Sequence, residues 1–161
     1  MARRQSSSKP SKPSRSLEQE AYLSLRRTAD VLARSTEEAL KPFGISGTQY
    51  NILRILRGAG TDGLCCREAA ERMLTHDPDV TRLLDRLERR GLVVRTRASS
   101  DRRVITAQIT PEGLRILAKL DKPIEEFHLR QLGHLGPRRL ERLIGLLNSA
   151  RSAGPAPARP A

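Results

Sequence analysis

The sequence predicts a mainly α fold with a small β-wing, that is, a winged helix-turn-helix with flanking N- and C-terminal dimerisation helices. Apolar residues recur with the helical period along most of the chain, and two β-branched runs directly follow a basic amphipathic helix. The chain has 161 residues, of which 37% are hydrophobic. It is therefore long enough for one domain with an apolar core and needs no second one.

Basic residues are in large excess. Thirty Lys and Arg against eighteen Asp and Glu give a formal net charge of +12, which is typical of a protein with a polyanionic partner. Residues 1–16 are basic and rich in Ser and Pro, and residues 152–161 contain a Pro- and Ala-rich run. We expect a disordered arm and a disordered tail there, because neither segment can bury enough apolar surface to fold. The arm either keeps the protein soluble or adds contacts to phosphates.

The folded part is expected over residues 17–151 and begins with a long helix over residues 17–41. Its apolar stripe consists of Leu17, Ala21, Leu25, Ala29, Leu32 and Leu40. Pro42 and Gly44 end this helix, because proline cannot continue a helix and glycine readily leaves it.

Two shorter helices follow. Ser46 with Gln49 three residues later is the pattern of a capping box, so a helix is expected from near Gly47 to Gly58. The glycine-rich turn after it leads into a third helix over Arg67 to Leu74.

A basic helix comes next and makes a helix-turn-helix with the third. Asp77 is the expected N-cap and Pro78 the first helical residue, and the helix runs to Arg90. The positions that follow the i, i+3, i+4, i+7 rule and should face the core are Val80, Leu83, Leu84 and Leu87. The side chains left facing outward are Thr81, Arg82, Asp85, Arg86 and Arg89.

A hairpin and two helices complete the domain. Leu92 to Arg97 and Val104 to Ile109 are β-branched, alternate in part and are separated by a short basic turn, so we expect them to pair. Thr110 and Pro111 then start another long helix, which Pro123 should kink. The last helix is expected at about residues 138–151.

The flanking helices predict a homodimer. A DNA-binding core needs only residues 46–110, and the apolar stripes at residues 17–41 and 112–151 exceed what so small a unit can cover. We expect them to pair with the same helices of a second subunit. Burial against their own domain is the alternative.

Over residues 17–151 the chain resembles the MarR family of winged-helix transcription regulators. The family's wing signature, Asp-x-Arg and, after five residues, Leu-Thr-x-x-Gly, is present as Asp101, Arg103, Ile109, Thr110 and Gly113, with isoleucine in place of leucine. The resemblance implies a homodimer that binds a pseudo-palindromic operator on double-stranded DNA, usually as a repressor. It also implies release by a small-molecule effector bound between the DNA-binding and dimerisation parts.

The DNA contacts can be predicted from the residues as well. Arg82 and Arg86 lie one turn apart on the outward face and can reach guanine edges or phosphates, while Thr81 near the helix start can meet a base edge or a thymine methyl group. A guanidinium at the wing tip, from Arg102 or Arg103, can enter a narrow minor groove. The remaining candidates are Arg89 on the helix, Arg95 and Arg97 on the hairpin, and Asp101 as the group that orients a wing arginine. For the helix arginines a solvated basic face is the alternative, and for Arg95 and Arg97 a plain surface role. Asp85 is expected to orient Arg82 or Arg89.

Cys65 and Cys66 are adjacent, near the start of the third helix. A thiol at a helix N-terminus can become reactive, so the pair is a possible redox sensor. Small buried residues in a reducing compartment are the simpler interpretation. A disulfide between the two is disfavoured, because neighbouring Cα atoms are about 3.8 Å apart and a disulfide usually needs ~4.4 Å or more.

Other functions find little support. The three histidines do not share a metal-ligand spacing, no catalytic constellation is visible, and we expect no cofactor, no metal and no enzyme activity. The chain opens without a signal-peptide pattern and holds no run of roughly 18 apolar residues, so we expect a cytoplasmic protein with no membrane partner. An RNA- or ribosome-associated basic protein is the main alternative, although 2% aromatic residues leave few stacking platforms. A winged helix that binds another protein is a third, but it would not need arginines on both helix and wing.

Overall fold

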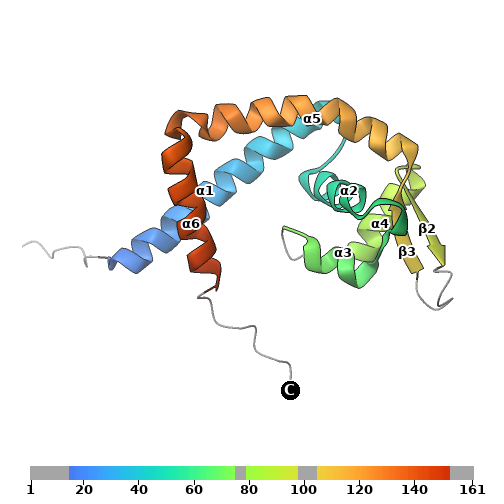
Figure 1. Cartoon of the computed structure of the whole chain (residues 1–161), viewed down its shortest axis with the longest axis horizontal. Helices are drawn as coiled ribbons and strands as arrows, with labels where there is room; N and C mark the ends of the chain where they lie inside the picture. Colours follow the sequence, from blue (N-terminus) through green and yellow to red (C-terminus); the bar gives the residue numbers. More distant parts are fainter. Residues whose placement is uncertain (1–14, 75–78, 98–104, 153–161) are drawn as a thin grey trace, which may run out of the picture. The chain divides into compact units, whose positions relative to one another are not determined.

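The computed structural model describes residues 15–74, 79–97 and 105–152. The elements are mainly helical, with one small sheet (Figure 1). They run in the order α1 (Leu17–Leu40), the 3-10 turn η1 (Lys41–Phe43), α2 (Gly47–Ala59), η2 (Gly60–Asp62), β1 (Leu64–Cys65), α3 (Cys66–Arg72), α4 (Val80–Arg89), β2 (Val93–Arg97), β3 (Ile105–Ile109), α5 (Pro111–Leu132), η3 (Gly133–Leu135) and α6 (Pro137–Ser152). The mainly α fold with a small β-wing is confirmed. The chain divides into two compact units between Ser35 and Thr36.

One apolar core holds the second unit together. Its fully buried side chains come from the end of α1, from α2, α4, the start of β2 and α5, and the largest are Leu40, Ile52, Leu53, Leu56, Leu83, Leu84, Leu87, Leu92, Leu117 and Leu120. The four predicted inward positions of α4 are all buried. The core also extends past residue 110, the predicted limit of the DNA-binding part, because Leu117, Leu120 and Ile124 of α5 pack into it.

The hairpin forms with the predicted partners and gains a third strand. β2 pairs antiparallel with β3, from Val93 opposite Ile109 to Arg97 opposite Ile105. The two-residue strand β1 pairs on the other edge of β3, with Leu64 opposite Ala107. β1 lies at the end of the glycine-rich turn predicted before the third helix, and two residues give no readable alternation from which a strand could be predicted. The first residue of the predicted second strand, Val104, lies outside the described residues.

Several helix ends agree with the predicted caps. The Ser46 hydroxyl accepts from the Gln49 N–H at 3.2 Å, and the Gln49 side chain accepts from the Ser46 N–H at 3.2 Å, which completes the capping box. Thr110 caps α5, since its hydroxyl accepts from the Gly113 N–H at 3.1 Å. α5 continues through Pro123 as one helix.

Two predicted helix ends were wrong. α4 starts at Val80 and not at Pro78, with Asp79 as its N-cap, because the Asp79 carboxylate accepts from the Arg82 N–H at 3.0 Å. Asp77 and Pro78 lie outside the described residues. α3 stops at Arg72 and not at Leu74, because the Leu74 N–H instead donates to the Asn51 side chain at 2.9 Å.

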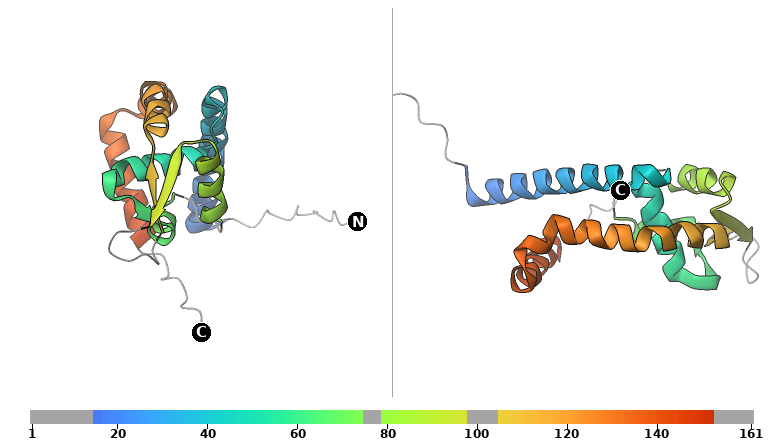
Figure 2. Two further views of the ribbon diagram at one scale, coloured as in Figure 1. Left: turned by 90° about the vertical axis from the view of Figure 1, so that its right-hand side faces the viewer. Right: turned by 90° about the horizontal axis from the view of Figure 1, so that it is seen from above.

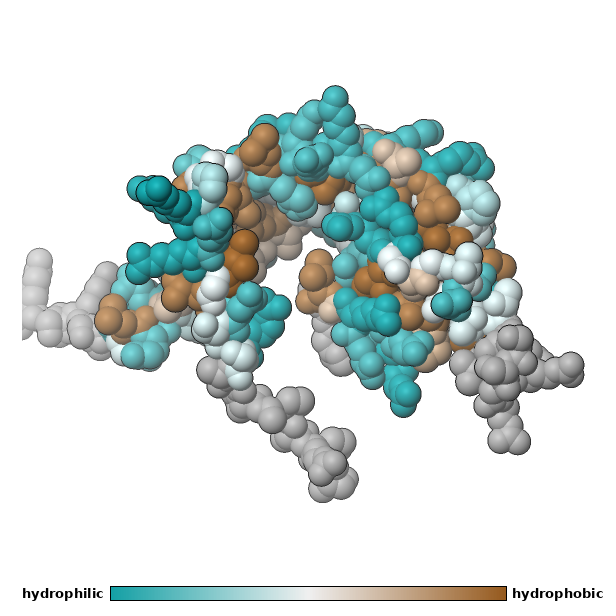
Figure 3. Space-filling model, viewed as in Figure 1, coloured by the Kyte–Doolittle hydropathy of each residue, from teal (hydrophilic) through white to brown (hydrophobic). Residues whose placement is uncertain are grey.

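Apolar side chains remain exposed on the flanking helices. Leu17 on α1 is 81% exposed, and α6 has no fully buried residue, with Ile144 at 57% and Leu146 at 61% exposure. Figure 3 shows hydrophobic surface on both helices. Leu17, Ile144 and Leu146 are therefore largely open to water in a single chain.

Candidate nucleic-acid interface

The outward face of α4 is basic, and the opposite face anchors the helix in the apolar core. Thr81, Arg82, Arg86 and Arg89 are exposed, while the opposite face of the helix is buried in the core. The high contrast between the two faces fixes the rotation of the helix, because turning it would expose leucines. The structure therefore brings the predicted helix residues together on one surface.

The arginines of this face are partly ordered by their own helix. Arg82 pairs with Asp79 at 3.0 Å. The Nε–H groups of Arg86 and Arg89 donate to the backbone carbonyls of Arg82 and Asp85, each at 3.3 Å. Each guanidinium has further N–H groups, which can bond to a phosphate or a base edge.

The predicted partner of Asp85 was wrong. Asp85 pairs with Arg95 of β2 at 2.6 Å and not with the side chain of Arg82 or Arg89. The same Arg95 guanidinium reaches Glu88 of α4 at 2.6 Å. These hydrogen bonds hold the pKa of the Glu88 carboxyl below its usual range and raise the pKa of Arg95. Arg95, predicted to meet phosphates, is thus held against α4.

The wing tip lies outside the described residues. Asp101, Arg102 and Arg103 belong to it, and Arg97 is the last residue of β2, opposite Ile105. The position of the two strands is nevertheless fixed at their base. The Thr110 N–H donates to the Leu92 carbonyl at 3.1 Å, and the Thr110 hydroxyl donates to the Gly91 carbonyl at 2.7 Å. Gly91 has a φ of 69°, which allows the chain to turn sharply from α4 into β2.

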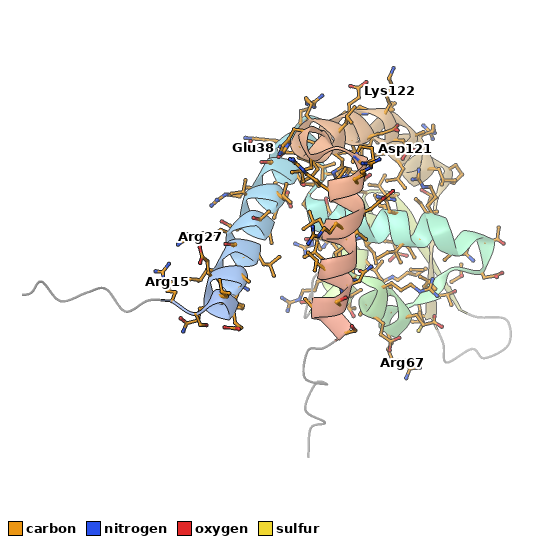
Figure 4. All side chains as sticks on the ribbon, turned by 60° about the vertical axis from the view of Figure 1, so that its left-hand side comes forward. Arg15, Arg27, Glu38, Arg67, Asp121 and Lys122 are labelled. Atoms are coloured by element: carbon orange, nitrogen blue, oxygen red, sulfur yellow. The ribbon has the colours of Figure 1, made fainter. Side chains whose placement is uncertain are left out.

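Two arginines outside the predicted contact surface, Arg90 and Arg57, have structural partners. Arg90, the C-cap of α4, donates to the Gly44 carbonyl at 2.9 Å and to the Gln49 side chain at 3.2 Å. Arg57 of α2 pairs with Asp121 of α5. No local pattern reveals these contacts, since the partners are far apart in the sequence. Arg67 of α3 also lies outside the predicted contact surface, and its exposed side chain extends outward from the helix (Figure 4).

The two cysteines are free and partly buried. Cys65 belongs to β1 and also precedes α3, where its backbone N–H donates to the Glu68 carboxylate at 2.9 Å. This hydrogen bond lowers the pKa of Glu68. Glu68 therefore caps the helix start, at a position where the sequence has a thiol instead of a hydroxyl.

In the part of the chain that the structure describes, no cluster of three or more His, Cys, Asp or Glu side chains could hold a metal ion. None of the helices described is both long and apolar enough to span a membrane.

The surface on α4 lies next to the hairpin, and β2 packs directly against the helix (Figure 2). A basic helix and a two-stranded ribbon side by side can contact a major groove and the neighbouring backbone or minor groove at once.

Comparisons with known proteins agree with this arrangement. A family model described as MarR family matches residues 43–104. The homoprotocatechuate degradative operon repressor of Escherichia coli is 31% identical over 121 residues, covering 68% of this chain and 78% of the repressor. A MarR transcription factor from Planctomyces limnophilus is 45% identical, with a TM-score of 0.64, over 83% of this chain and 97% of that chain. CouR from Rhodococcus jostii RHA1, solved bound to p-coumaroyl-CoA, is 27% identical with a TM-score of 0.73, over 91% and 100% of the two chains.

Proposed function

The chain belongs to the MarR family of transcription regulators, and from this membership we propose that it binds a pseudo-palindromic operator on double-stranded DNA as a homodimer. The observation that carries the proposal is the exposed basic face of α4 beside the β2–β3 hairpin. A helix of this kind reads base edges in the major groove, because its side chains can carry several guanidinium groups to one short stretch of bases.

Thr81, Arg82, Arg86 and Arg89 are the proposed contacts on the helix. Arg82 and Arg86 lie one turn apart, so both can reach the same half-site. Arg97, Arg102 and Arg103 are the proposed contacts on the wing, with Asp101 orienting one of the arginines. The excess of Lys and Arg over Asp and Glu adds sequence-independent attraction to the phosphates.

The exposed apolar faces of α1 and α6 support the homodimer. A single chain leaves Leu17, Ile144 and Leu146 largely open to water, and contiguous exposed apolar faces are typical of an interface between subunits. A two-fold dimer would present two α4 helices to two half-sites of one operator.

We further propose that the protein represses transcription and is released by a small-molecule effector. The E. coli relative is named as the repressor of a degradative operon, and CouR was solved with p-coumaroyl-CoA bound. Release by oxidation of Cys65 or Cys66 is the alternative route. On that route hydrogen peroxide would release the wild type but not a variant in which both cysteines are replaced by serine; on the effector route peroxide would release neither.

Footprinting on the DNA upstream of the protein's own gene tests the proposal. Two protected half-sites about one helical turn apart, filled by two subunits, are expected. Uniform protection along the fragment, or a single protected half-site filled by one subunit, would contradict the proposed homodimeric reading of an operator.

A further inference from the structure

We propose that Arg95 is a positioning residue, which fixes the wing strand β2 on the recognition helix α4 and shields two α4 carboxylates from DNA, instead of binding a phosphate itself. The inference rests on the proposed function and assigns a role within the same surface. It differs from the sequence-based expectation, which placed Arg95 among the residues that meet DNA.

Arg95 is held by more contacts than any other arginine of this surface in the described residues. Its Nε–H donates to one Glu88 carboxylate oxygen at 2.8 Å, and a terminal nitrogen lies 2.6 Å from both the Glu88 and the Asp85 carboxylates. Its backbone N–H donates to the other Glu88 oxygen at 3.1 Å. Glu88 therefore grips both the backbone and the side chain of the same residue.

Exposure separates this arginine from those that are proposed to bind DNA. The Arg95 side chain is 26% exposed, whereas that of Arg82 is 82% exposed. An arginine engaged with two carboxylates would have to break both contacts before it could bind a phosphate. That exchange gains little, because one anionic partner replaces two.

The contact also decides where the hairpin lies. Arg95 is the middle residue of β2, opposite Ala107 of β3. The start of β2 is already fixed, because the Leu92 N–H donates to the Leu87 carbonyl at 3.0 Å. A second attachment further along β2 removes the freedom of the strand to swing away from α4, and β3 follows through its ladder with β2.

Charge gives the contact a second effect. Asp85 and Glu88 sit on the helix that is proposed to enter the groove, where unpaired carboxylates would repel phosphates. Pairing with Arg95 places one positive charge between the two carboxylates and offsets one of their two negative charges. Removal of one carboxylate therefore changes the affinity for DNA in opposite directions for the two roles of Arg95, positioning of β2 and direct binding of a phosphate.

Glu88→Gln is the decisive variant. It removes a negative charge near DNA, so a phosphate-binding Arg95 predicts equal or tighter operator binding. The positioning role predicts binding weakened by about three- to tenfold, because the hairpin loses its attachment. Glu71→Gln, which makes the same change at an exposed carboxylate of α3, is the matched control and should bind as well as the wild type or slightly better.

A double-mutant cycle with Arg95→Gln checks the pairing. In the positioning role, Arg95→Gln adds little further loss to Glu88→Gln, since either change breaks the same contact. Additive losses, or a Glu88→Gln variant that binds as well as the wild type, would overturn the proposal. Melting curves of each variant confirm that binding is measured on folded protein.

Amide hydrogen exchange in the free protein separates this proposal from the proposed function. Glu88→Gln should speed exchange in β2 and leave α5 unchanged; equal exchange in β2 would overturn the attachment whatever the DNA result. If the wild type binds no duplex DNA, the proposed function fails, and the exchange result still decides whether Glu88 holds the strand.

Discussion

Arg57 of α2 and Asp121 of α5, 64 residues apart in the sequence, form a two-pronged contact in which the guanidinium donates to both carboxylate oxygens, at 2.8 and 3.0 Å. Asp121 lies on the long helix that continues from the hairpin towards α6 (Figure 4). The contact therefore joins the helix-turn-helix core to the helix that leads out of it. The guanidinium lowers the pKa of Asp121.

Asp121→Asn should reduce the free energy of unfolding at pH 7 by about 0.5–1 kcal/mol, a small value because both side chains are partly exposed. Because the pKa of Asp121 is lower in the folded state, the stabilisation is present above its ordinary pKa of about 4 and is lost as the pH falls through the folded value. Urea unfolding of the variant and the wild type at pH 7 and at about pH 3 measures the loss of unfolding free energy and its dependence on pH. Glu126→Gln, at an exposed site of the same helix, is the control, and an equal loss at both pH values would contradict the account.

Gly113→Ala should destabilise the fold by about 2–3 kcal/mol, because the new methyl group would overpack the site. A Cβ there would lie 2.5 Å from the Leu92 carbonyl oxygen and 2.7 Å from the Ile109 side chain. The carbonyl is part of the backbone at the base of the wing and cannot move aside. Gly58→Ala in α2, where nothing lies within 4 Å, should instead stabilise the fold by about 0.5–1 kcal/mol. Thermal unfolding of both variants tests the difference in sign.

Arg82→Ala and Arg86→Ala should each weaken operator binding by about 1–3 kcal/mol and relax the preference for one base pair of the site. Fluorescence anisotropy with the operator and with single-base variants of it measures both effects. Unchanged affinity and unchanged preference would show that the proposed face of α4 is not the reading surface.

Replacing Arg102 and Arg103 together by alanine should weaken binding and flatten its salt dependence. Each phosphate contact that is lost lowers the slope of log K against log salt by about 0.9. The measurement is a salt titration of the operator complex for the variant and the wild type. A slope equal to that of the wild type would remove the wing tip from the contact surface.

Features that depend on neighbouring residues could be predicted from the sequence. The buried face of α4 follows from Val80, Leu83, Leu84 and Leu87 at helical spacing, and all four are buried. The capping box at Ser46 and the cap at Thr110 also formed, because each needs only a partner three residues on. The predicted start of α4 was wrong for the same reason, because two Asp residues flank Pro78 and the local pattern does not distinguish which of them caps the helix.

Features that depend on distant residues could not be predicted from the sequence. β1 forms because Leu64 meets Ala107 across the sheet, and two residues alone have no strand pattern. Arg90 bonds to Gly44, 46 residues away, so only the packed core brings them together. Arg95 illustrates the consequence for function. Its residue type and position suggested a phosphate contact, while its carboxylate partners lie on a different element.

The most direct test of the central claim is fluorescence anisotropy of the full chain with duplex DNA from its own upstream region, beside a scrambled duplex and single-stranded RNA, across a salt series. The account predicts tight binding to the upstream duplex with two subunits per site, and much weaker, more salt-sensitive binding to the other two. Equal and steeply salt-dependent binding to all three would contradict it. The basic surface would then act without base readout, as in an RNA- or ribosome-associated protein.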